Sequence, residues 1–401
     1  MLLKKCNFFE TLQKSTPRVR LTNGNGHGTM RKTPKGKSMK LTITPKRKNE
    51  YLSTYRYRQI KPADGVCVSS ALICLRCSRF GGKFIPSMTV ADVSTLPDYR
   101  NRGLVRGILT EAHQQGAALG AFVSILHPFS FDFYRKFGYE KVSDTVTLRF
   151  PLASLSPLNT GDRLTPLTKE YEGGLLSLFR DFTRERNLCL DRYDIATFLR
   201  KRADTLLLRK GDDLLGYVIC EKNQETETLF VSELGFRTEM ELKRLLSALV
   251  AYGQGLKTLV FADAEPIPEL YRILGILGCD LSRESRGDLA ARILNTEEML
   301  RANRYPKARG HFVIRVEDDM ESVRGCFEVT YEDGLCAVQR LPFDSATDLS
   351  VTAPALARLL YGHDIYTKEL AEQAVGVTLF SDASDFFRAF PKRICGLFEH
   401  F

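Results

Sequence analysis

The segment MTVADVSTLPDYRNRGLVRGILTEA, residues 88–112, combines residue types that can hold a phosphate group. A strand pattern runs into a loop with Arg100, Arg102 and Gly103, and this loop opens an amphipathic helix that carries Arg106. Backbone N–H groups at a helix N-terminus carry partial positive charge and bind phosphate oxygens, and glycine removes the Cβ that would hinder a close approach. The pattern favours a pyrophosphate cradle, although the local pattern alone leaves open an ordinary turn with solvated arginines.

A second informative segment is HPFSFDFYRKFGYE, residues 127–140, which places Tyr134 on a short helix after the next strand. Phe131, Phe133 and Phe137 lie around this phenol in the sequence, so a purely structural aromatic core is the alternative interpretation.

The ten cysteines indicate neither a metal centre nor a disulfide framework. Cys74 and Cys77 form a lone CxxC motif with no second pair or HxxxH motif nearby. Scattered cysteines in apolar stretches are usually buried free thiols. We expect no metal, and a reducing cytoplasm fits this cysteine usage.

The elements that must position these residues follow from hydrophobic periodicity. Two strand runs around Gly81-Gly82, then a helix, a strand, a short helix and a strand, indicate an α/β unit. We expect these elements at 66–79, 83–95, 104–119, 121–126, 130–136 and 138–150.

The next segment repeats this order, so the two halves look like copies of one fold. Its expected helices are 172–184, 193–200, 240–252 and 268–277, and its expected strands are 205–209, 214–221, 229–236 and 256–262. The second copy has Arg237-Thr238-Glu239 where the first has its Arg-x-x-Gly loop.

The last hundred residues predict an α+β layer. Strand patterns at 311–317, 325–331 and 335–341 surround an Asp333-Gly334 hairpin turn. An apolar helix follows, with Thr352 as its N-cap and Gly362 at its end.

The two motifs at this spacing resemble the GNAT acetyltransferase superfamily. More narrowly, DVSTLPDYRNRGLVR and FYRKFGYE are similar to motifs of the Eis (enhanced intracellular survival) N-acetyltransferases. The resemblance covers roughly residues 64–401 and implies α/β and α+β architecture: tandem GNAT folds, the second degenerate, followed by a sterol-carrier-protein-like α+β domain. The boundaries we predict are 1–61 for a terminal segment, 62–152 and 153–290 for the GNAT folds, and 291–401 for the last domain.

The resemblance also implies roles for individual residues. Tyr134 would be the general acid, and the C-terminal carboxylate of Phe401 would be the general base. Residues that would contact the cofactor are Val93, Ser94, Thr95, Arg100, Asn101, Arg102, Gly103, Leu104, Val105, Arg106, Phe129 and Ser130.

The implied activity is acetyl-CoA-dependent transfer of an acetyl group to a primary amine, by direct attack in a ternary complex. The acceptor would be an aminoglycoside-like polyamine or a lysine, and the assembly would be a hexamer. A carboxylate can take the proton that an attacking amine must lose. A phenol of free pKa ~10 can protonate a leaving thiolate whose conjugate acid has a pKa of ~8.5.

The terminal segment departs from the rest. Residues 1–61 hold 16 of the 58 Lys and Arg residues but only two of the 48 Asp and Glu residues. We interpret it as disordered or aberrant, with a transit peptide or a nucleic-acid arm as alternatives. The GNAT fold begins with a strand and two helices, and the nearest helix candidate here is the short, basic segment 46–60.

The remaining chain is slightly acidic, so no basic groove for nucleic acid is predicted on the folded body. No stretch reaches the ~18 apolar residues of a membrane helix. The alternative function is a catalytically impaired acyl-CoA- or lipid-binding protein, which the unusual N-terminus motivates.

Overall fold

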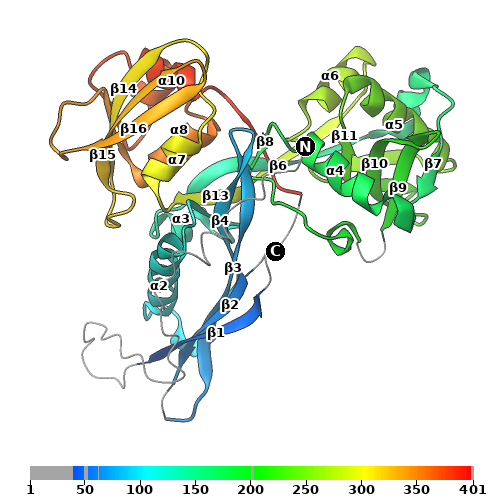
Figure 1. The fold of residues 1–401 in the computed structure, drawn as a ribbon. Coiled ribbons are helices and arrows are strands. Elements are labelled where there is room, and N and C mark those ends of the chain that lie inside the picture. The colour runs from blue at the N-terminus through cyan, green and yellow to red at the C-terminus, as the bar shows by residue number, and fades with distance from the viewer. Residues whose placement is uncertain (1–38, 49–52, 62, 200–202, 399–401) are drawn as a thin grey trace.

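The computed structural model describes residues 39–48, 53–61, 63–199 and 203–398, and Figure 1 shows their arrangement. A sheet of twelve strands runs through the N-terminal and middle parts of this chain, and a separate five-stranded sheet forms the C-terminal part. The strand order of the large sheet is β1-β2-β3-β4-β5-β13-β6-β12-β11-β10-β9-β7.

The first half of the large sheet is built as the sequence predicts from residue 67 onward. A long antiparallel hairpin turns at Gly81-Gly82 and leads through a loop into the helix. The elements are β3 (Cys67–Phe80), β4 (Lys83–Thr95), α2 (Leu104–Ala118), β5 (Val123–Leu126), α3 (Phe131–Arg135) and β6 (Glu140–Pro151).

Two further strands precede this unit, β1 (Lys40–Lys48) and β2 (Ser53–Ile60). The prediction of a disordered or aberrant segment over 1–61 is therefore wrong for these residues, and 53–60 is a strand rather than part of a basic helix. The reason is a period of two: Tyr57 is buried on one face, whereas Arg56 points to the other face and pairs with Asp92 at 3.0 Å.

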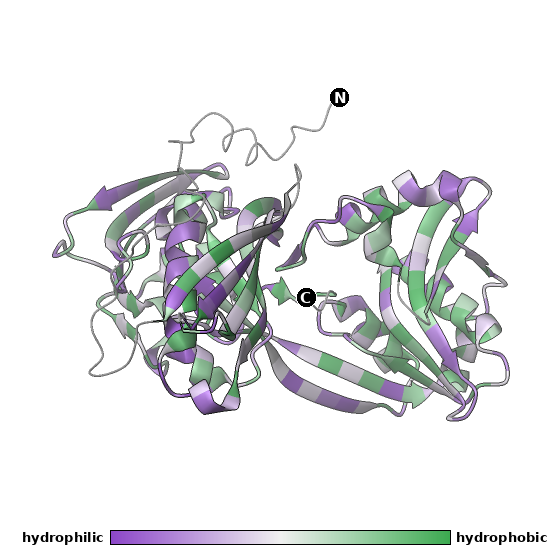
Figure 2. Ribbon diagram, turned by 90° about the horizontal axis from the view of Figure 1, so that it is seen from below, coloured by the Kyte–Doolittle hydropathy of each residue, from purple (hydrophilic) through white to green (hydrophobic). Residues whose placement is uncertain are grey.

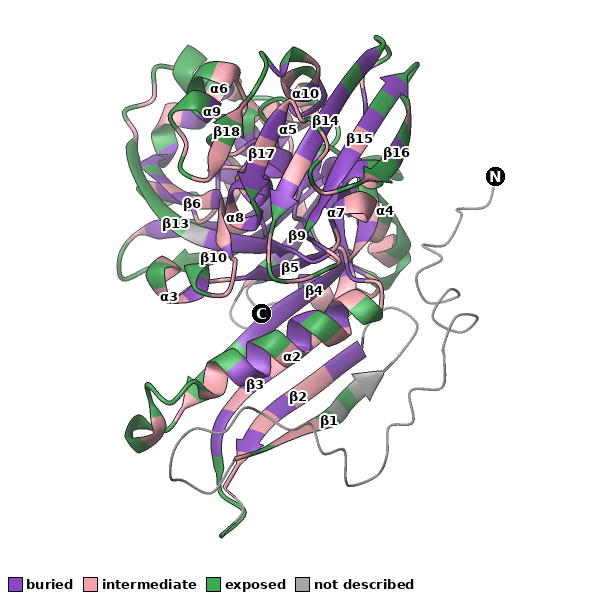
Figure 3. Ribbon diagram, turned by 90° about the vertical axis from the view of Figure 1, so that its left-hand side faces the viewer, coloured by how far each residue is buried: buried purple, intermediate pink, exposed green. Residues whose placement is uncertain are grey.

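Helix α2 packs on one face of the sheet, against β2, β3 and β4, as Figure 3 shows. Its buried residues, among them Ile108, Leu109 and Ala112, pack against Ile73 and Val90 of the sheet. The spacing of these residues matches the predicted apolar face, so burial against the sheet fixes the helix and its N-terminal loop in place.

The two halves of the large sheet are joined by β6 and β13 (Ser282–Ile293). Strand β13 pairs antiparallel with β5 at one end and along most of β6, while the far end of β6 pairs with β12 (Thr258–Phe261). In Figure 2, strands with alternating hydrophilic and hydrophobic residues span the two lobes. The predicted boundary at residue 290 falls inside β13.

The second half of the sheet is formed by the middle part of the chain. Its strands are β7 (Leu164–Pro166), β9 (Asp204–Lys210), β10 (Asp213–Asn223) and β11 (Thr228–Phe236), and its helices are α4 (Glu172–Phe182), α5 (Glu239–Tyr252) and α6 (Pro268–Ile276). The helix expected at 193–200 is only a short 3₁₀ turn over Ile195–Phe198 in the described part of that range.

The C-terminal part is an α+β layer, as the sequence predicts. Its sheet has the order β16-β15-β14-β17-β18. Its elements are α7 (Thr296–Ala302), β14 (Gly310–Glu317), β15 (Gly325–Glu332), β16 (Leu335–Leu341), β17 (Leu349–Thr352), α8 (Ala353–Tyr361), α9 (Lys368–Glu372), β18 (Val377–Leu379) and α10 (Ser384–Ala389). Leu356, Leu359 and Phe386 are fully buried in its core.

The last described residues run along the junction between the three parts. Strand β19 (Ile394–Cys395) pairs in parallel with β8 (Arg186–Asn187), and the hydroxyl of Ser143 donates to the carbonyl oxygen of Cys395 at 2.9 Å. Phe398 packs against Phe182 with ring centroids 5.7 Å apart. These contacts hold the chain end against both β6 and the middle part.

Candidate active site

An opening in the first half of the sheet lies between β4 and β5. The two strands pair in parallel only over Ser87–Thr89 of β4 and Val123–Ile125 of β5. Beyond this point Leu126 pairs with Ala290 of β13, whereas residues 90–95 of β4 continue along β3. The edge of β4 that faces away from β3 therefore has no strand partner in the described chain beyond Thr89.

A bulge in β4 lies at this opening. The pairing with β3 shifts register between Ala91 and Ser94, and Asp92 has a φ of 48°. Bulges twist a strand away from its neighbour and re-aim its side chains. The bulge thus accounts locally for the separation of β4 from β5.

Val93, Ser94 and Thr95 follow the bulge. The hydroxyl of Ser69 donates to the carbonyl oxygen of Ser94 at 2.9 Å and also lies 2.9 Å from the Thr95 hydroxyl. Ser94 is exposed, whereas Val93 and Thr95 are half-buried. These three residues line the β4 side of the opening, with their backbone fixed by β3.

The loop after β4 ends in a left-handed turn that starts α2. Asn101 has a φ of 60° and Gly103, the N-cap residue, has a φ of 73°. A Cβ at Gly103 would meet no atom within 4 Å, so glycine is required here by the backbone conformation rather than by crowding. Asparagine is among the few other residues that accept this conformation.

The N-terminus of α2 can receive an anion. The first N–H groups of a helix have no partner within the helix, and the first turn of α2 contains no acidic residue. Leu104 and Val105 are half-buried, and Arg106 is exposed.

Arginine side chains surround this terminus. The Arg102 guanidinium donates to the carbonyl oxygen of Asp98 at 2.7 Å and lies over the Tyr99 ring, and Arg100 Nε lies 3.5 Å from the carbonyl oxygen of Thr95. Arg106 lies over the ring of Phe137, with its Cζ atom 5.2 Å from the centroid. All three guanidinium groups belong to exposed residues and leave donors free to turn toward a phosphate.

Tyr134 lies on the other side of the opening, in α3. Only 3% of the residue is exposed, and burial raises the pKa of its phenol to about 12. Phe133 and Tyr139 pack edge-on against its ring, with centroids 5.1 and 5.8 Å away. Tyr134 is therefore held as a neutral phenol at physiological pH.

Phe129 and Ser130 precede α3. Phe129 is 70% exposed although it packs against the Tyr134 ring. Ser130 is the N-cap of α3, and its hydroxyl accepts from the Phe133 N–H at 3.3 Å. The Ser130 oxygen therefore caps α3, and the hydroxyl proton can still be donated to a ligand.

A buried polar group lies beneath Tyr134 that the sequence analysis does not single out. The Tyr139 hydroxyl lies 2.6 Å from the Ser124 hydroxyl and 2.9 Å from Nε2 of His113. Burial, and then the nearby charge of Arg292, hold the pKa of His113 well below its usual range. His113 is therefore neutral, and the three side chains anchor α2, β5 and β6 to one another.

The structure brings the predicted cofactor residues and Tyr134 to one opening, from β4, α2 and the β5–α3 connection. Phe401 lies outside the described residues, and the last described contact of the chain end is Phe398 on Phe182.

The second half of the sheet uses the equivalent helix N-terminus differently. Thr238 caps α5, and the Glu241 carboxylate accepts from the N–H groups of Arg237 and Thr238 at 2.8 and 2.7 Å. The Glu241 side chain thus closes a capping box at the start of α5.

A buried ion pair lies on β11, in the second half of the sheet. Glu233 lies just beyond the last residue of β11 that pairs with β12. Its carboxylate accepts from Arg192 at 2.6 and 2.7 Å and from Tyr217 at 2.6 Å, and all three residues are buried. The Glu233 carboxylate is therefore paired within the middle part of the chain.

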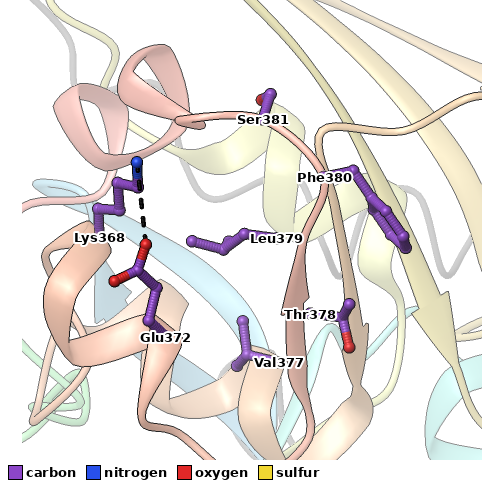
Figure 4. Close-up of a pocket in the computed structure, with 7 residues that line it drawn as sticks. All are labelled: Lys368, Glu372, Val377, Thr378, Leu379, Phe380 and Ser381. Atoms are coloured by element: carbon purple, nitrogen blue, oxygen red, sulfur yellow. Dashed lines mark ion pairs between the residues drawn. The ribbon is translucent and has the colours of Figure 1, made fainter.

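A shallow, open groove of about 480 Å³ lies elsewhere, in the C-terminal part (Figure 4). Helix α9 and strand β18 line it, and Lys368 and Glu372 face each other across one side at 3.8 Å. None of its lining residues belongs to the opening described above.

Among the described residues, no group of three or more His, Cys, Asp or Glu side chains could hold a metal ion. No helix in the described ranges is both long and apolar enough to cross a membrane.

Comparison with known proteins identifies the class to which this site belongs. Residues 38–142 match the family model of the acetyltransferase (GNAT) domain. No curated protein sequence matches the chain. The match covers β1 through the start of β6, which are the elements that form the opening.

Solved structures extend the likeness to most of the chain. The GCN5-related N-acetyltransferase of Anabaena variabilis has a TM-score of 0.74 at 16% identity, over 86% of this chain and 89% of that chain. The GCN5-related N-acetyltransferase of Kribbella flavida has a TM-score of 0.71 at 20% identity, over 86% and 88%. Eis1 of Mycobacterium abscessus has a TM-score of 0.66 at 18% identity, over 86% and 90%.

Residues 38–142 therefore form a GNAT acetyltransferase domain. The fold of the larger part of the chain is shared with GNAT N-acetyltransferases, among them Eis1, at a sequence identity that shows the fold alone. The recognition of an acetyltransferase from the two motifs is confirmed.

Proposed function

We propose that the protein transfers an acetyl group from acetyl-CoA to a primary amine, directly and within a ternary complex. The observation that carries this proposal is the opening between β4 and β5. An open helix N-terminus lies on one side, and a buried, protonated phenol lies on the other. Coenzyme A thioesters carry a pyrophosphate and a thioester in one ligand, and these two features could receive them.

The residues fit acetyl-CoA. The loop at 101–103, together with Leu104, Val105 and Arg106, would hold the pyrophosphate, because the helix terminus is free of acidic side chains. The unpaired edge of Val93–Thr95 would hydrogen-bond the pantetheine amides in the manner of an added strand. Phe129 and Ser130 would contact the far side of the ligand.

Tyr134 would act as the general acid. The amine nitrogen attacks the thioester carbonyl carbon, the C–S bond breaks, and the thiolate takes a proton from the phenol. With a pKa of about 12, Tyr134 is protonated at neutral pH, and the same shift makes it a weaker acid toward a thiolate whose conjugate acid has a pKa of ~8.5.

We also propose the carboxylate of Phe401 as the base that accepts the ammonium proton. Contacts of Cys395 with Ser143 and of Phe398 with Phe182 hold the preceding residues at the junction of the parts. Thiol release by the full chain would be compared with a chain extended past Phe401, and with binding of acetyl-CoA as the control. Loss of turnover with retained binding supports this base, and unchanged turnover removes it.

The acceptor would approach the face of the sheet turned away from α2. Arg58, Leu72 and Cys74 are only half-buried there. The acceptor would be an aminoglycoside-like polyamine or a lysine. Thiol release from acetyl-CoA, measured with a panel of aminoglycosides and lysine peptides, distinguishes the two.

At the level of the whole chain, we propose tandem GNAT folds with a degenerate second copy, followed by a sterol-carrier-protein-like domain. The matching order of β10-β11-α5-β12-α6 and β3-β4-α2-β5-α3 supports the tandem arrangement. A hexamer and a cytoplasmic location remain predictions, and sedimentation velocity tests the first of them.

A further inference from the structure

A buried ion pair connects the C-terminal part to the turn that follows α3. We propose that Asp318 and Arg292 are positioning residues for Tyr134, so that the C-terminal part helps to place the catalytic phenol. This inference rests on the proposed role of Tyr134 as the general acid.

Arg292, on β13, holds the turn after α3 directly. Its Nη1 atom donates to the carbonyl oxygen of Phe137 at 2.5 Å. The guanidinium also lies against Gly138, where an added Cβ would come within 1.6 Å of Nη1. Gly138 has a φ of 81°, so both the conformation and the space at this residue require glycine.

The same turn ends the helix of Tyr134. The carbonyl oxygen of Tyr134 accepts from the N–H of Phe137 at 2.9 Å and from the N–H of Tyr139 at 3.3 Å. A shift of Phe137 therefore moves the end of α3, because these bonds are the ones that close the helix.

Asp318 holds Arg292 from the C-terminal part. Its carboxylate accepts from Nη2 of Arg292 at 2.9 and 3.3 Å, and only 8% of the Asp318 side chain and 9% of the Arg292 side chain are exposed. The N–H of Met320 donates to Asp318 at 2.7 Å, which fixes the carboxylate in turn. Met320 also packs against the core under α2, so this loop is seated on the GNAT domain.

The turn touches the proposed cofactor cradle as well. Arg106, in the first turn of α2, lies over the ring of Phe137. Phe137 is thus held through its carbonyl oxygen by Arg292 and covered on its ring by Arg106. Loss of the ion pair would disturb the position of the Tyr134 phenol more than the cofactor cradle. The reason is that Arg292 binds the Phe137 carbonyl group, whereas Arg106 of the cradle contacts only the Phe137 ring.

The test measures kcat for Asp318→Asn, which keeps the shape of the side chain and removes its charge. Reactive groups misplaced by ~1 Å can lose ~100-fold in rate, and we expect a fall of about tenfold here. Glu185→Gln is the matched control. It removes an ion pair between Glu185 and Arg304, at 2.9 Å, that also joins separate parts of the chain but does not touch α3. Its kcat should not change.

A double-mutant cycle separates positioning from mere stabilisation. Tyr134→Phe should lower kcat by much less in the Asp318→Asn background than in the wild type, because the phenol is already misplaced there. Equal losses in both backgrounds would overturn the positioning role. If Tyr134→Phe alone left kcat unchanged, the proposed role of Tyr134 would fail instead.

Hydrogen exchange gives a readout that does not depend on turnover. In Asp318→Asn, the amides of Phe137 and Tyr139 should exchange faster, while the amides of α5 should keep their wild-type rates. Asp318→Glu, which retains the charge, should restore slow exchange and part of kcat. Unchanged exchange at Phe137 and Tyr139 in Asp318→Asn would contradict the inference.

Discussion

Phe129 and Tyr134 lie edge to face with ring centroids 5.3 Å apart, yet Phe129 is 70% exposed and Tyr134 is 3% exposed. A large exposed aromatic ring beside a buried phenol marks the mouth of the opening between β4 and β5. The pair links the surface that a ligand meets first to the group that we propose donates a proton.

Replacement of Phe129 by alanine tests the mouth of the site. We expect KM for acetyl-CoA to rise about fivefold, because an exposed aromatic contact of ~1 kcal/mol with the ligand is lost. Phe380→Ala is the control, since Phe380 is 60% exposed but lies in the groove of the C-terminal part. Steady-state kinetics at saturating amine measures both, and an equal KM for the two variants would contradict the assignment.

Replacement of Gly103 by alanine tests the cradle. Alanine in the left-handed conformation costs ~1–2 kcal/mol of stability, and we expect acetyl-CoA affinity to fall as the loop relaxes. Gly211→Ala is a matched control, because Gly211 also has a positive φ, of 60°, and open space around its Cβ position. Both variants should unfold at lower temperature, whereas calorimetric titration should show weaker binding for Gly103→Ala alone. Equal affinities would remove the loop from the site.

The raised pKa of Tyr134 predicts the alkaline behaviour of the enzyme. A phenol of pKa about 12 stays protonated through pH 10, so no loss of kcat from its ionisation should occur below that pH. The acceptor amine loses its own proton as the pH rises, and this makes the rate increase. If kcat instead fell near pH 10, where the acceptor amine is already neutral, the general acid would be a group whose pKa is not raised.

The buried His113 predicts a loss of stability in acid. Its folded-state pKa lies below the unfolded value of ~6.5, so the unfolded chain binds more protons as the pH falls through that value. The free energy of unfolding should fall by up to ~1.4 kcal/mol per pH unit below pH 6.5 for this group. Urea denaturation at pH 7.5 and 5.5 measures the fall.

His113→Gln should show a smaller dependence on pH over this range. His363, whose pKa is also lowered by burial, provides a residual dependence of the same sign in both proteins. An identical dependence in the variant and the wild type would show that the pKa of His113 is not lowered by folding.

The local parts of the site could be predicted from the sequence. The hydrophobic pattern and the motif spacing were sufficient to predict α2, its glycine loop and the hairpin of β3 and β4. Each of these elements depends on residues that are close together in the chain. The alternation in STYRYRQI was also visible, but its charge led to the prediction of a basic segment without ordered elements. The burial of Tyr57 in the core formed with α2 is what fixes this segment as a strand of the sheet.

The parts that could not be predicted depend on contacts between distant residues. Strand β13 inserts between β5 and β6 from more than a hundred residues away. Arg292 and Asp318 look like solvated charges in the sequence, and only the fold shows them buried together. The same is true of Arg192 and Glu233, which are buried as an ion pair in the middle part of the chain.

The most direct test of the account measures thiol release from acetyl-CoA by the wild type and by Tyr134→Phe, with a panel of aminoglycosides and lysine peptides. The account predicts turnover by the wild type with at least one acceptor, and a kcat lower by more than about tenfold in the variant. Binding of acetyl-CoA should be the same in both. Equal turnover by the two proteins, with equal binding, would contradict the proposed role of Tyr134 at the centre of this site.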